Sequence, residues 1–122
     1  MSEAYKLPKE TPEQMAVRTG AIQAGLMKAA EVPLETARWC AEVATIAALC
    51  AEKGNTNAAS DAGVAALLAE AACRGAAYNV RINVSAMPDK AAGAPLATEA
   101  ERLVASARAA AARATVAVES HI

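Results

Sequence analysis

Apolar residues recur at three- and four-residue steps along most of the chain, which is the periodicity of amphipathic α-helices. Near the N-terminus, for example, Met15, Ile22, Leu26 and Ala29 fall on one side of such a helix. No segment shows the alternation of apolar and polar residues that is typical of a half-buried strand. The pattern therefore predicts an all-α protein, organised as an Ala-rich bundle of four main helices.

Capping and helix-breaking residues predict the ends of the first two helices. Residues 11–14 (TPEQ) form a capping box, so the first helix is expected to run from there to about residue 30. Pro33 is expected to end it, because the residue before a proline is disfavoured in the α-helical conformation. The same proline can start a second helix that reaches Lys53. Gly54 can then close that helix in the left-handed conformation.

Two more helices are predicted in the second half of the chain. The third is expected at about residues 60–84 and is the most apolar, as in a helix that is buried nearly all round. Residues 90–97 contain Gly and Pro and are expected to form a linker. A second capping box at residues 98–101 (TEAE) is expected to open a fourth helix that ends near Glu119. Residues 1–122 are thus expected to form a single helical domain.

Alanine dominates the composition and changes the expected architecture. Ala is the best helix former, because its side chain loses no entropy when the helix forms. It also buries little apolar surface, so a core made of alanine is thin. The chain contains no Phe and a single Trp that could enlarge the core. We therefore expect such a chain to need long helices, a partner chain, or both.

The net charge, the cysteines and the lengths of the apolar stretches restrict the possible partners, location and metal sites of the chain. The net charge of −1 at pH 7 implies no general attraction to nucleic acid or to an anionic membrane. The N-terminus lacks the apolar core of a signal peptide, and the most apolar stretch, 62–84, contains charged and amide side chains that are costly in lipid. The three cysteines have no CxxC spacing and are expected to be reduced, buried thiols in a cytoplasmic protein. A lone His121 gives no metal-ligand set, so no metal site is expected.

The third predicted helix carries two polar stripes. Asp61 and Asn79 point the same way, and Asn83 lies about 40° round the helix; Glu70 and Arg74 form a predicted surface ion pair on the opposite side. A run of Ala and Gly beside the first stripe would let another helix approach closely. Amides buried there must meet backbone, water, a partner or a ligand, since an unpaired one costs on the order of 1–3 kcal/mol. Alternatively, the carboxylate only complements the helix dipole and the amides bond neighbouring backbone.

Two lysines lie in the N-terminal segment before the first long helix. Lys6 and Lys9 stand on either side of Leu7-Pro8. Such a segment is ordinarily a solvated lead-in to a helix. Two lysines fixed around a proline could instead meet a carboxylate or phosphate tail. Both interpretations remain open from the residues alone.

The chain resembles the cyclodeaminase/cyclohydrolase family of folate enzymes through an ordered set of segments: AYKLPKETPEQ, then Arg18, then AAEVPLETA, GNTNAASDAGVAA and GAAYNVRIN. That family includes formiminotetrahydrofolate cyclodeaminase and methenyltetrahydrofolate cyclohydrolase. The resemblance runs from Ala4 to Asp89 and implies an all-α fold that forms homodimers. It also implies a reaction at the one-carbon unit of a tetrahydrofolate, by ring closure with loss of ammonia or by ring opening with water. No metal or redox cofactor is implied.

The resemblance also implies site residues. Six polar residues match the patterned polar positions of the family: Lys6, Lys9, Asn55, Asp61, Asn79 and Asn83. We expect Asp61, Asn79 and Asn83 to be catalytic, the carboxylate by handling a proton and the amides by orienting the folate. The other three are expected to bind the substrate, with the two lysines at its glutamate tail.

Family members are longer than this chain, which corresponds to the C-terminal half of their pattern. The expected partners are therefore a folate and either a second copy or a complementary N-terminal half. Activity is expected only when the missing half is supplied. The alternative is a non-catalytic helical module derived from the same family, whose Ala-rich faces mediate self-association.

Overall fold

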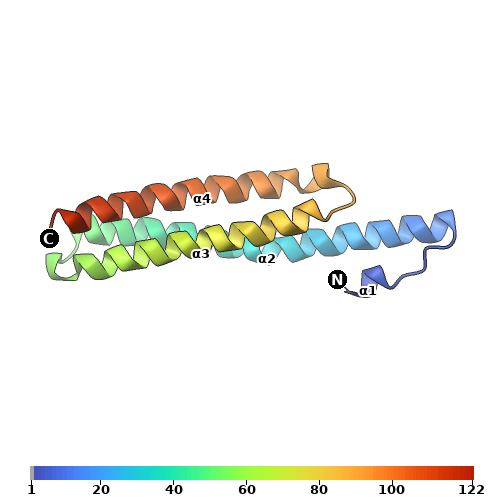
Figure 1. Ribbon diagram of the computed structural model, residues 1–122, viewed down its shortest axis with the longest axis horizontal. Helices are drawn as coiled ribbons and strands as arrows, with labels where there is room; N and C mark the ends of the chain where they lie inside the picture. The colour runs from blue at the N-terminus through green and yellow to red at the C-terminus, as the bar shows by residue number, and fades with distance from the viewer. Residues whose placement is uncertain (1) are drawn as a thin grey trace.

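The computed structural model describes residues 2–122. These residues form four α-helices, α1 (Ser2–Tyr5), α2 (Pro12–Lys53), α3 (Ala59–Ser85) and α4 (Lys90–Glu119), with a 3₁₀ turn, η1 (Thr56–Ala58), before α3. No strand occurs among the described residues, and the predicted all-α bundle is confirmed. The three long helices lie side by side in an elongated bundle, and α1 folds back along the end of α2 that extends beyond α3 and α4 (Figure 1).

The helix break predicted at Pro33 is wrong. α2 runs for 42 residues through this proline without interruption. Ala30 and Leu34 stand on either side of it and are both buried in the core. Packing against the neighbouring helices therefore holds the segment helical and overrides the local preference of a residue that precedes a proline.

The two ends of α2 follow the sequence signals in part. The capping box at Thr11 and Gln14 is confirmed, because each side chain bonds the backbone of the other residue. At the other end, Gly54 closes the helix with its N–H bonded to the carbonyl of Cys50 at 2.8 Å. Its φ of −82° is not left-handed, so the conformation predicted for this glycine is wrong. A glycine is nonetheless required there, since a Cβ would lie 2.5 Å from the Cys50 oxygen.

The linker predicted at residues 90–97 is also wrong, because these residues form the first turns of α4. The N-cap is Asp89, whose side chain accepts a hydrogen bond from the N–H of Ala92 at 3.2 Å. Gly93 is buried, and a Cβ at this position would lie 2.5 Å from the Sδ atom of Met87. The absence of a side chain at Gly93 thus lets the first turns of α4 pack onto the end of α3. From the sequence alone, the glycine and proline of this segment indicated a linker instead.

A side chain of α2 also forms hydrogen bonds to the turn between α3 and α4. The side chain of Gln23 donates to the main-chain oxygen of Asp89 at 3.0 Å and accepts from its N–H at 2.9 Å. Both polar main-chain groups of the turn between α3 and α4 at this residue are therefore paired. The pairing joins residues 66 positions apart in the chain, so α4 is anchored at its N-cap residue.

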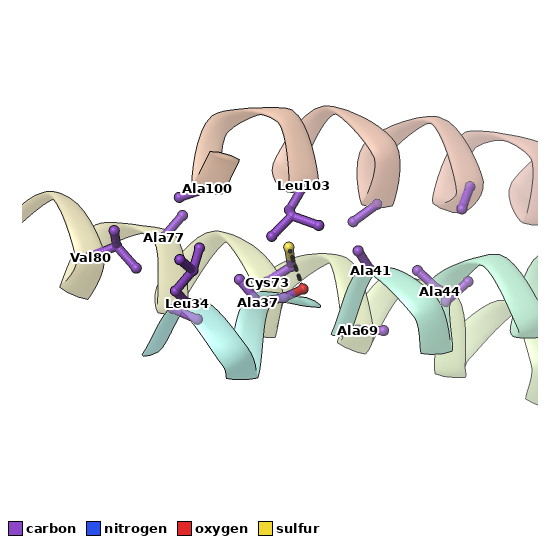
Figure 2. Packing of buried hydrophobic residues seen from close by; sticks show 14 of the residues in the cluster. Leu34, Ala37, Ala41, Ala44, Ala69, Cys73, Ala77, Val80, Ala100 and Leu103 are labelled. Atoms are coloured by element: carbon purple, nitrogen blue, oxygen red, sulfur yellow. Dashed lines mark hydrogen bonds between the residues drawn. The ribbon is translucent and has the colours of Figure 1, made fainter. Parts of the chain in front are cut away.

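The core is a thin layer of alanines with a few larger side chains. The larger buried residues are Ile22, Leu26, Leu34, Val80, Val84, Met87 and Leu103. Figure 2 shows Leu34, Val80 and Leu103 among the alanines of the three helices. Because each alanine buries little surface, these few side chains provide a large share of the apolar surface that the fold removes from water.

The three cysteines are free thiols in different environments. Cys73 is fully buried, and its Sγ donates to the carbonyl of Ala37 at 3.5 Å (Figure 2). Burial raises the pKa of the Cys73 thiol, so the protonated form is favoured. Cys40 is half-buried, whereas Cys50 is exposed. The expectation that all three are buried is therefore wrong for Cys50.

Ion pairs fasten α4 to α2 at two levels. Arg38 donates two hydrogen bonds to the carboxylate of Glu99, at 2.5 and 2.9 Å. Further along, Arg113 pairs with Glu52. Both pairs lie on the surface, where an ion pair contributes little to stability but can help to set the register of two helices.

The Arg38–Glu99 pair predicts a pH-dependent difference in stability. The hydrogen bond from Arg38 lowers the pKa of Glu99. A carboxyl whose pKa is lower in the folded state stabilises the fold above its unfolded pKa, and this contribution is lost as the pH falls through the folded pKa. We expect Glu99→Gln to lower the melting temperature slightly at neutral pH and to leave it unchanged at a pH below the folded pKa of Glu99, where the carboxyl is protonated.

Thermal melts followed by circular dichroism at the two pH values would measure this difference. Glu101→Gln is the matched control, because Glu101 is exposed on the same helix and forms no ion pair among residues 2–122. If Glu99→Gln lowered the melting temperature by the same amount at both pH values, the substitution would act through packing and not through the charge of Glu99.

α3 is not buried nearly all round, contrary to the sequence-based expectation. Large apolar side chains remain exposed on it and on α2: Val32, Trp39, Val43 and Ile46 on α2, and Val64, Leu67, Leu68 and Ile82 on α3. The reason is that only α2 and α4 pack against α3, so one side of the helix has no neighbour.

None of the helices within residues 2–122 is both long enough and apolar enough to cross a membrane.

Candidate functional site

A shallow groove of about 530 Å³ separates α2 from α3 on the uncovered side of the bundle. It is lined by small, apolar and amide side chains: Ala29, Val32, Pro33, Thr36, Ala72, Gly75, Ala76, Asn79 and Asn83. The groove exists because four of the lining positions carry residues no larger than alanine, where bulkier side chains would fill the space: Ala29, Ala72, Gly75 and Ala76. It coincides with the Ala/Gly face of α3 that the sequence predicted as a surface for close approach.

Pro33 determines the chemistry at one end of this groove. A proline inside a helix has no N–H to donate to the carbonyl four residues earlier, which here belongs to Ala29. The side chain of Asn83, on α3, donates to that carbonyl at 3.4 Å. The amide thus replaces the missing backbone donor and joins the two helices. This pairing explains why an asparagine is tolerated next to an otherwise apolar helix contact.

The second amide, Asn79, lies one turn before Asn83 on the same helix. Its side-chain Nδ2 donates to the main-chain carbonyl of Gly75 at 3.2 Å. The main-chain carbonyl of Asn79 accepts from Nδ2 of Asn83 at 2.9 Å. The interpretation that both amides bond neighbouring backbone is confirmed. The Oδ1 atoms of both amides, however, accept no hydrogen bond from any residue in the described part of the chain.

The predicted site residues at and before the start of α3 lie far from the two amides. Asp61 is exposed in the first turn of α3, about 27 Å from Asn79 along the helix axis. Asn55 accepts a hydrogen bond from the N–H of Asn57 at 2.9 Å and caps the turn η1. Both residues therefore lie at the end of the bundle where α2 meets α3, opposite to the N-terminal segment (Figure 1).

The lysines predicted to bind substrate lie at the opposite end. Lys6 and Lys9 are exposed, and Nζ of Lys6 is 3.8 Å from a carboxylate oxygen of Glu3. The segment is held by Arg18, which donates to the carbonyl of Tyr5 at 3.5 Å and lies over its ring. Within one chain, the six predicted site residues are therefore not brought together; only the two amides, Asn79 and Asn83, are adjacent.

Ionisable groups gather on the far side of α3, in a second groove between α3 and α4. Glu70 bonds Arg74 at 2.6 Å, which confirms the predicted surface pair, and Arg108 lies 3.9 Å from the same carboxylate. Arg81 and Glu101 also line this groove. The contribution of α4 to it has no local signal in the sequence, because it depends on how the helices pack.

The first groove offers apolar contacts and amide hydrogen-bonding groups, but it has no group of its own that can transfer a proton. None of its lining residues is ionisable near neutral pH. Sequence reasoning missed Val32, Pro33 and Thr36 as parts of this site. Pro33 gave a signal, since a proline followed by an apolar helical pattern leaves one carbonyl unpaired, but the partner on α3 is visible only in the structure.

Comparison with known proteins identifies the family. A family model described as Formiminotransferase-cyclodeaminase matches residues 1–102. A methenyltetrahydrofolate cyclohydrolase from Methylorubrum extorquens is 47% identical over 104 residues, which are 85% of this chain and 50% of that protein. A formimidoyltransferase-cyclodeaminase from Rattus norvegicus is 42% identical over 86 residues, which are 70% of this chain and 16% of that protein.

The chain thus spans about half the length of the cyclohydrolase that it matches and a smaller share of the bifunctional protein. The matched residues include the helices α2 and α3, the groove between them and both of its amides. Together with the all-α fold, these matches show that the chain belongs to the formiminotransferase-cyclodeaminase family.

Proposed function

We propose that the chain supplies the folate-binding wall of a one-carbon enzyme, with methenyltetrahydrofolate cyclohydrolase as the first reaction to test. The observation that carries the proposal is the pair of amides, Asn79 and Asn83, which present two unused carbonyl oxygens beside an apolar groove in a chain of this family. The cyclohydrolase is favoured over the cyclodeaminase because that relative is more similar and is matched over more of its length.

The groove suits the pterin end of a folate. A pterin ring is flat and carries N–H donors at its edge. The unused Oδ1 atoms can accept from such donors, while Val32 and Pro33 offer an apolar surface to a ring face. An amide paired to backbone on its nitrogen side is also held in one orientation. This fixed orientation lowers the entropy cost of binding.

The hydrolytic step requires a group outside the groove. Addition of water to the methenyl carbon forms a tetrahedral carbon, and a base must take the proton from that water. Asp61, the carboxylate predicted for this role, lies about 27 Å from Asn79 on the same helix and would have to come from a second copy. The alternative source is the complementary half of the family domain. We therefore propose that the chain acts in the cytoplasm, as part of a homo-oligomer or with that complementary half.

Replacing Asn79 by Ala tests the binding proposal. The side chain bonds only its own helix, so its removal leaves no buried donor unpaired. We expect the Kd for tetrahydrofolate to rise about tenfold, which corresponds to the loss of one hydrogen bond worth about 1.4 kcal/mol. Titrations followed by ¹⁵N chemical shifts would measure the change and show whether the shifts cluster on the groove.

Asn57→Ala is the matched control, since it makes the same chemical change at the opposite end of α3. It is expected to leave the Kd unchanged. Equal affinities of the wild-type chain and Asn79→Ala, or equal losses in both variants, would contradict the assignment of the groove as the folate site.

A second candidate function is a non-catalytic helical association module. It is favoured by the large apolar side chains left exposed on α2 and α3. Light scattering discriminates between the two. A chain that self-associates at micromolar concentration and shows no tetrahydrofolate-dependent shift at the groove would support the association module.

A further inference from the structure

The groove is the centre of a larger apolar surface, which we call the α2–α3 face. The face consists of the groove and six large side chains exposed beside it: Trp39, Val43, Ile46, Val64, Leu68 and Ile82. Each of the six is between 48% and 66% exposed. On α2, the three residues lie within about 40° of Val32, and on α3 the three lie within about 20° of Gly75. Both reference residues line the groove, so the six point to its open side.

The register of the two helices makes this face a channel. Asn83 bonds Ala29 and Cys73 bonds Ala37, so each step forward on α2 corresponds to a step back on α3. Val43 therefore lies across from about Leu68, and the large side chains form a ridge on either side. The groove itself spans residues 29–36 of α2 and 72–83 of α3, where its floor carries small residues such as Ala29, Ala72 and Ala76. From Val64 to Ile82 the whole face is about 27 Å long.

We infer that the α2–α3 face binds an amphipathic helix from the part of the family domain that lies outside this match. The match covers 50% of the Methylorubrum extorquens cyclohydrolase, so as much of that relative again has no counterpart in it. A channel of this length accommodates a helix of about eighteen residues. An apolar stripe on that helix would cover the exposed side chains, as a helix-in-groove contact requires. The inference rests on the proposed function in one respect: the docked helix becomes the second wall of the folate groove.

The concave shape disfavours a second copy of this chain as the occupant. A two-fold contact places the same patch on both partners, so the patch must fit itself. Two channels placed face to face bring their ridges together and leave their floors apart. A single helix presents a convex ridge of side chains, which fits between the two rows of large residues.

Charges at the borders of the face specify the helix further. Glu35 and Glu42 lie on the α2 side and form no ion pair among residues 2–122. The docked helix is therefore expected to carry basic side chains toward α2. This arrangement fixes its position in the channel as well as its affinity.

Co-expression tests the inference directly. The probe is the portion of the Methylorubrum extorquens cyclohydrolase that this chain does not match, expressed with the full 122-residue chain. We expect a one-to-one complex by size exclusion with light scattering. We also expect slower hydrogen exchange in the parts of α2 and α3 that carry the face. Because the two parts are produced together, the result does not depend on the probe folding alone.

Two charge substitutions distinguish specific binding at this face from nonspecific hydrophobic association. Leu68→Glu places a carboxylate on the ridge and is expected to weaken the complex at least 100-fold. Val116→Glu is the control, since Val116 is 69% exposed on α4 and lies outside the face; it is expected to change affinity less than threefold. Both side chains are exposed, so both variants should keep the helical circular dichroism of the wild type.

Gly75→Ala adds a methyl group to the lining of the groove without straining the chain, because a Cβ at this position meets no atom within 4 Å. We expect it to weaken the complex about tenfold. Gly20→Ala makes the same change on α2, also meets nothing within 4 Å, and lies outside the face. It should leave affinity unchanged.

Three outcomes would overturn the inference: no complex on co-expression, a complex that Leu68→Glu leaves intact, or a homodimer of the chain that Leu68→Glu dissociates. Tetrahydrofolate titrations distinguish this failure from failure of the proposed function. A complex that forms as described but shows no folate-dependent shift at Asn79 rejects the folate site and leaves the docking surface. Folate binding at the groove without any complex does the reverse.

Discussion

Replacing Pro33 by Ala is expected to raise the free energy of unfolding by up to about 3 kcal/mol, the difference between Pro and Ala in a helix interior. The new residue has an N–H that can donate to the carbonyl of Ala29, to which the side chain of Asn83 donates in the wild type. The substitution also removes the clash between the proline ring and that carbonyl. Urea unfolding followed by circular dichroism would measure the gain.

The same pair of residues forms a double-mutant cycle. Asn83→Ala alone is expected to lower the stability by about 1 kcal/mol, because it leaves the partly buried Ala29 carbonyl without a donor. In the Pro33→Ala background the same change should have almost no effect, since the backbone N–H has taken over. Additive effects of the two substitutions would show that Asn83 does not replace the missing backbone donor.

Leu34→Ala is expected to lower the free energy of unfolding by about 2–5 kcal/mol, as for other buried leucines. Leu34 is 3% exposed and is one of the few large side chains in a core made chiefly of alanine. The surrounding alanines have no flexible side chains that could move into the space, so the cavity should persist. A loss of this size is a large fraction of the stability of a domain, which is typically about 5–15 kcal/mol.

Leu68→Ala is the matched control for this prediction. It removes the same atoms from a leucine that is 66% exposed, and it is expected to change stability by less than about 0.5 kcal/mol. Urea unfolding of both variants at one pH would compare them. Similar losses in the two would mean that the exposed face is already covered in solution, by self-association of the chain.

Much of the local structure could be predicted from the sequence. The capping box at Thr11 and Gln14, the ends of α3 to within a few residues, and the Glu70–Arg74 pair are all interactions between residues close in the chain. Their energies depend on the local backbone, so pattern and composition are sufficient to find them. The family resemblance was likewise carried by residues in sequence order, and it is confirmed.

The failures at Pro33 and at residues 90–97 have a common physical cause. In both places local preference favours a break, and burial of neighbouring residues maintains the helix instead. Ala30 and Leu34 pack into the core across the proline, and Gly93 packs against Met87. Local preferences amount to a few kcal/mol at most, and contacts with other helices can exceed them.

In the candidate site, too, the local arrangement could be predicted from the sequence and the arrangement of distant residues could not. The sequence placed Asn79 and Asn83 on one face of one helix, and the structure has them there, one turn apart on the groove. It could not place them relative to Lys6 or Lys9, because those distances depend on the lengths of α2 and α3 and on their antiparallel packing. The roles of the six residues stay predictions, to be tested by the substitutions above.

The sequence by itself determined the all-α class, the helix cap at Thr11, the polar stripes of α3 and the family, since each follows from spacing along one chain. Only the tertiary structure decided that α2 is continuous, that α4 begins at Lys90, and that Asn83 pairs with the carbonyl left free by Pro33. It also decided which apolar residues stay uncovered. Packing between distant segments sets these features, because burial depends on which other helices are present to exclude water.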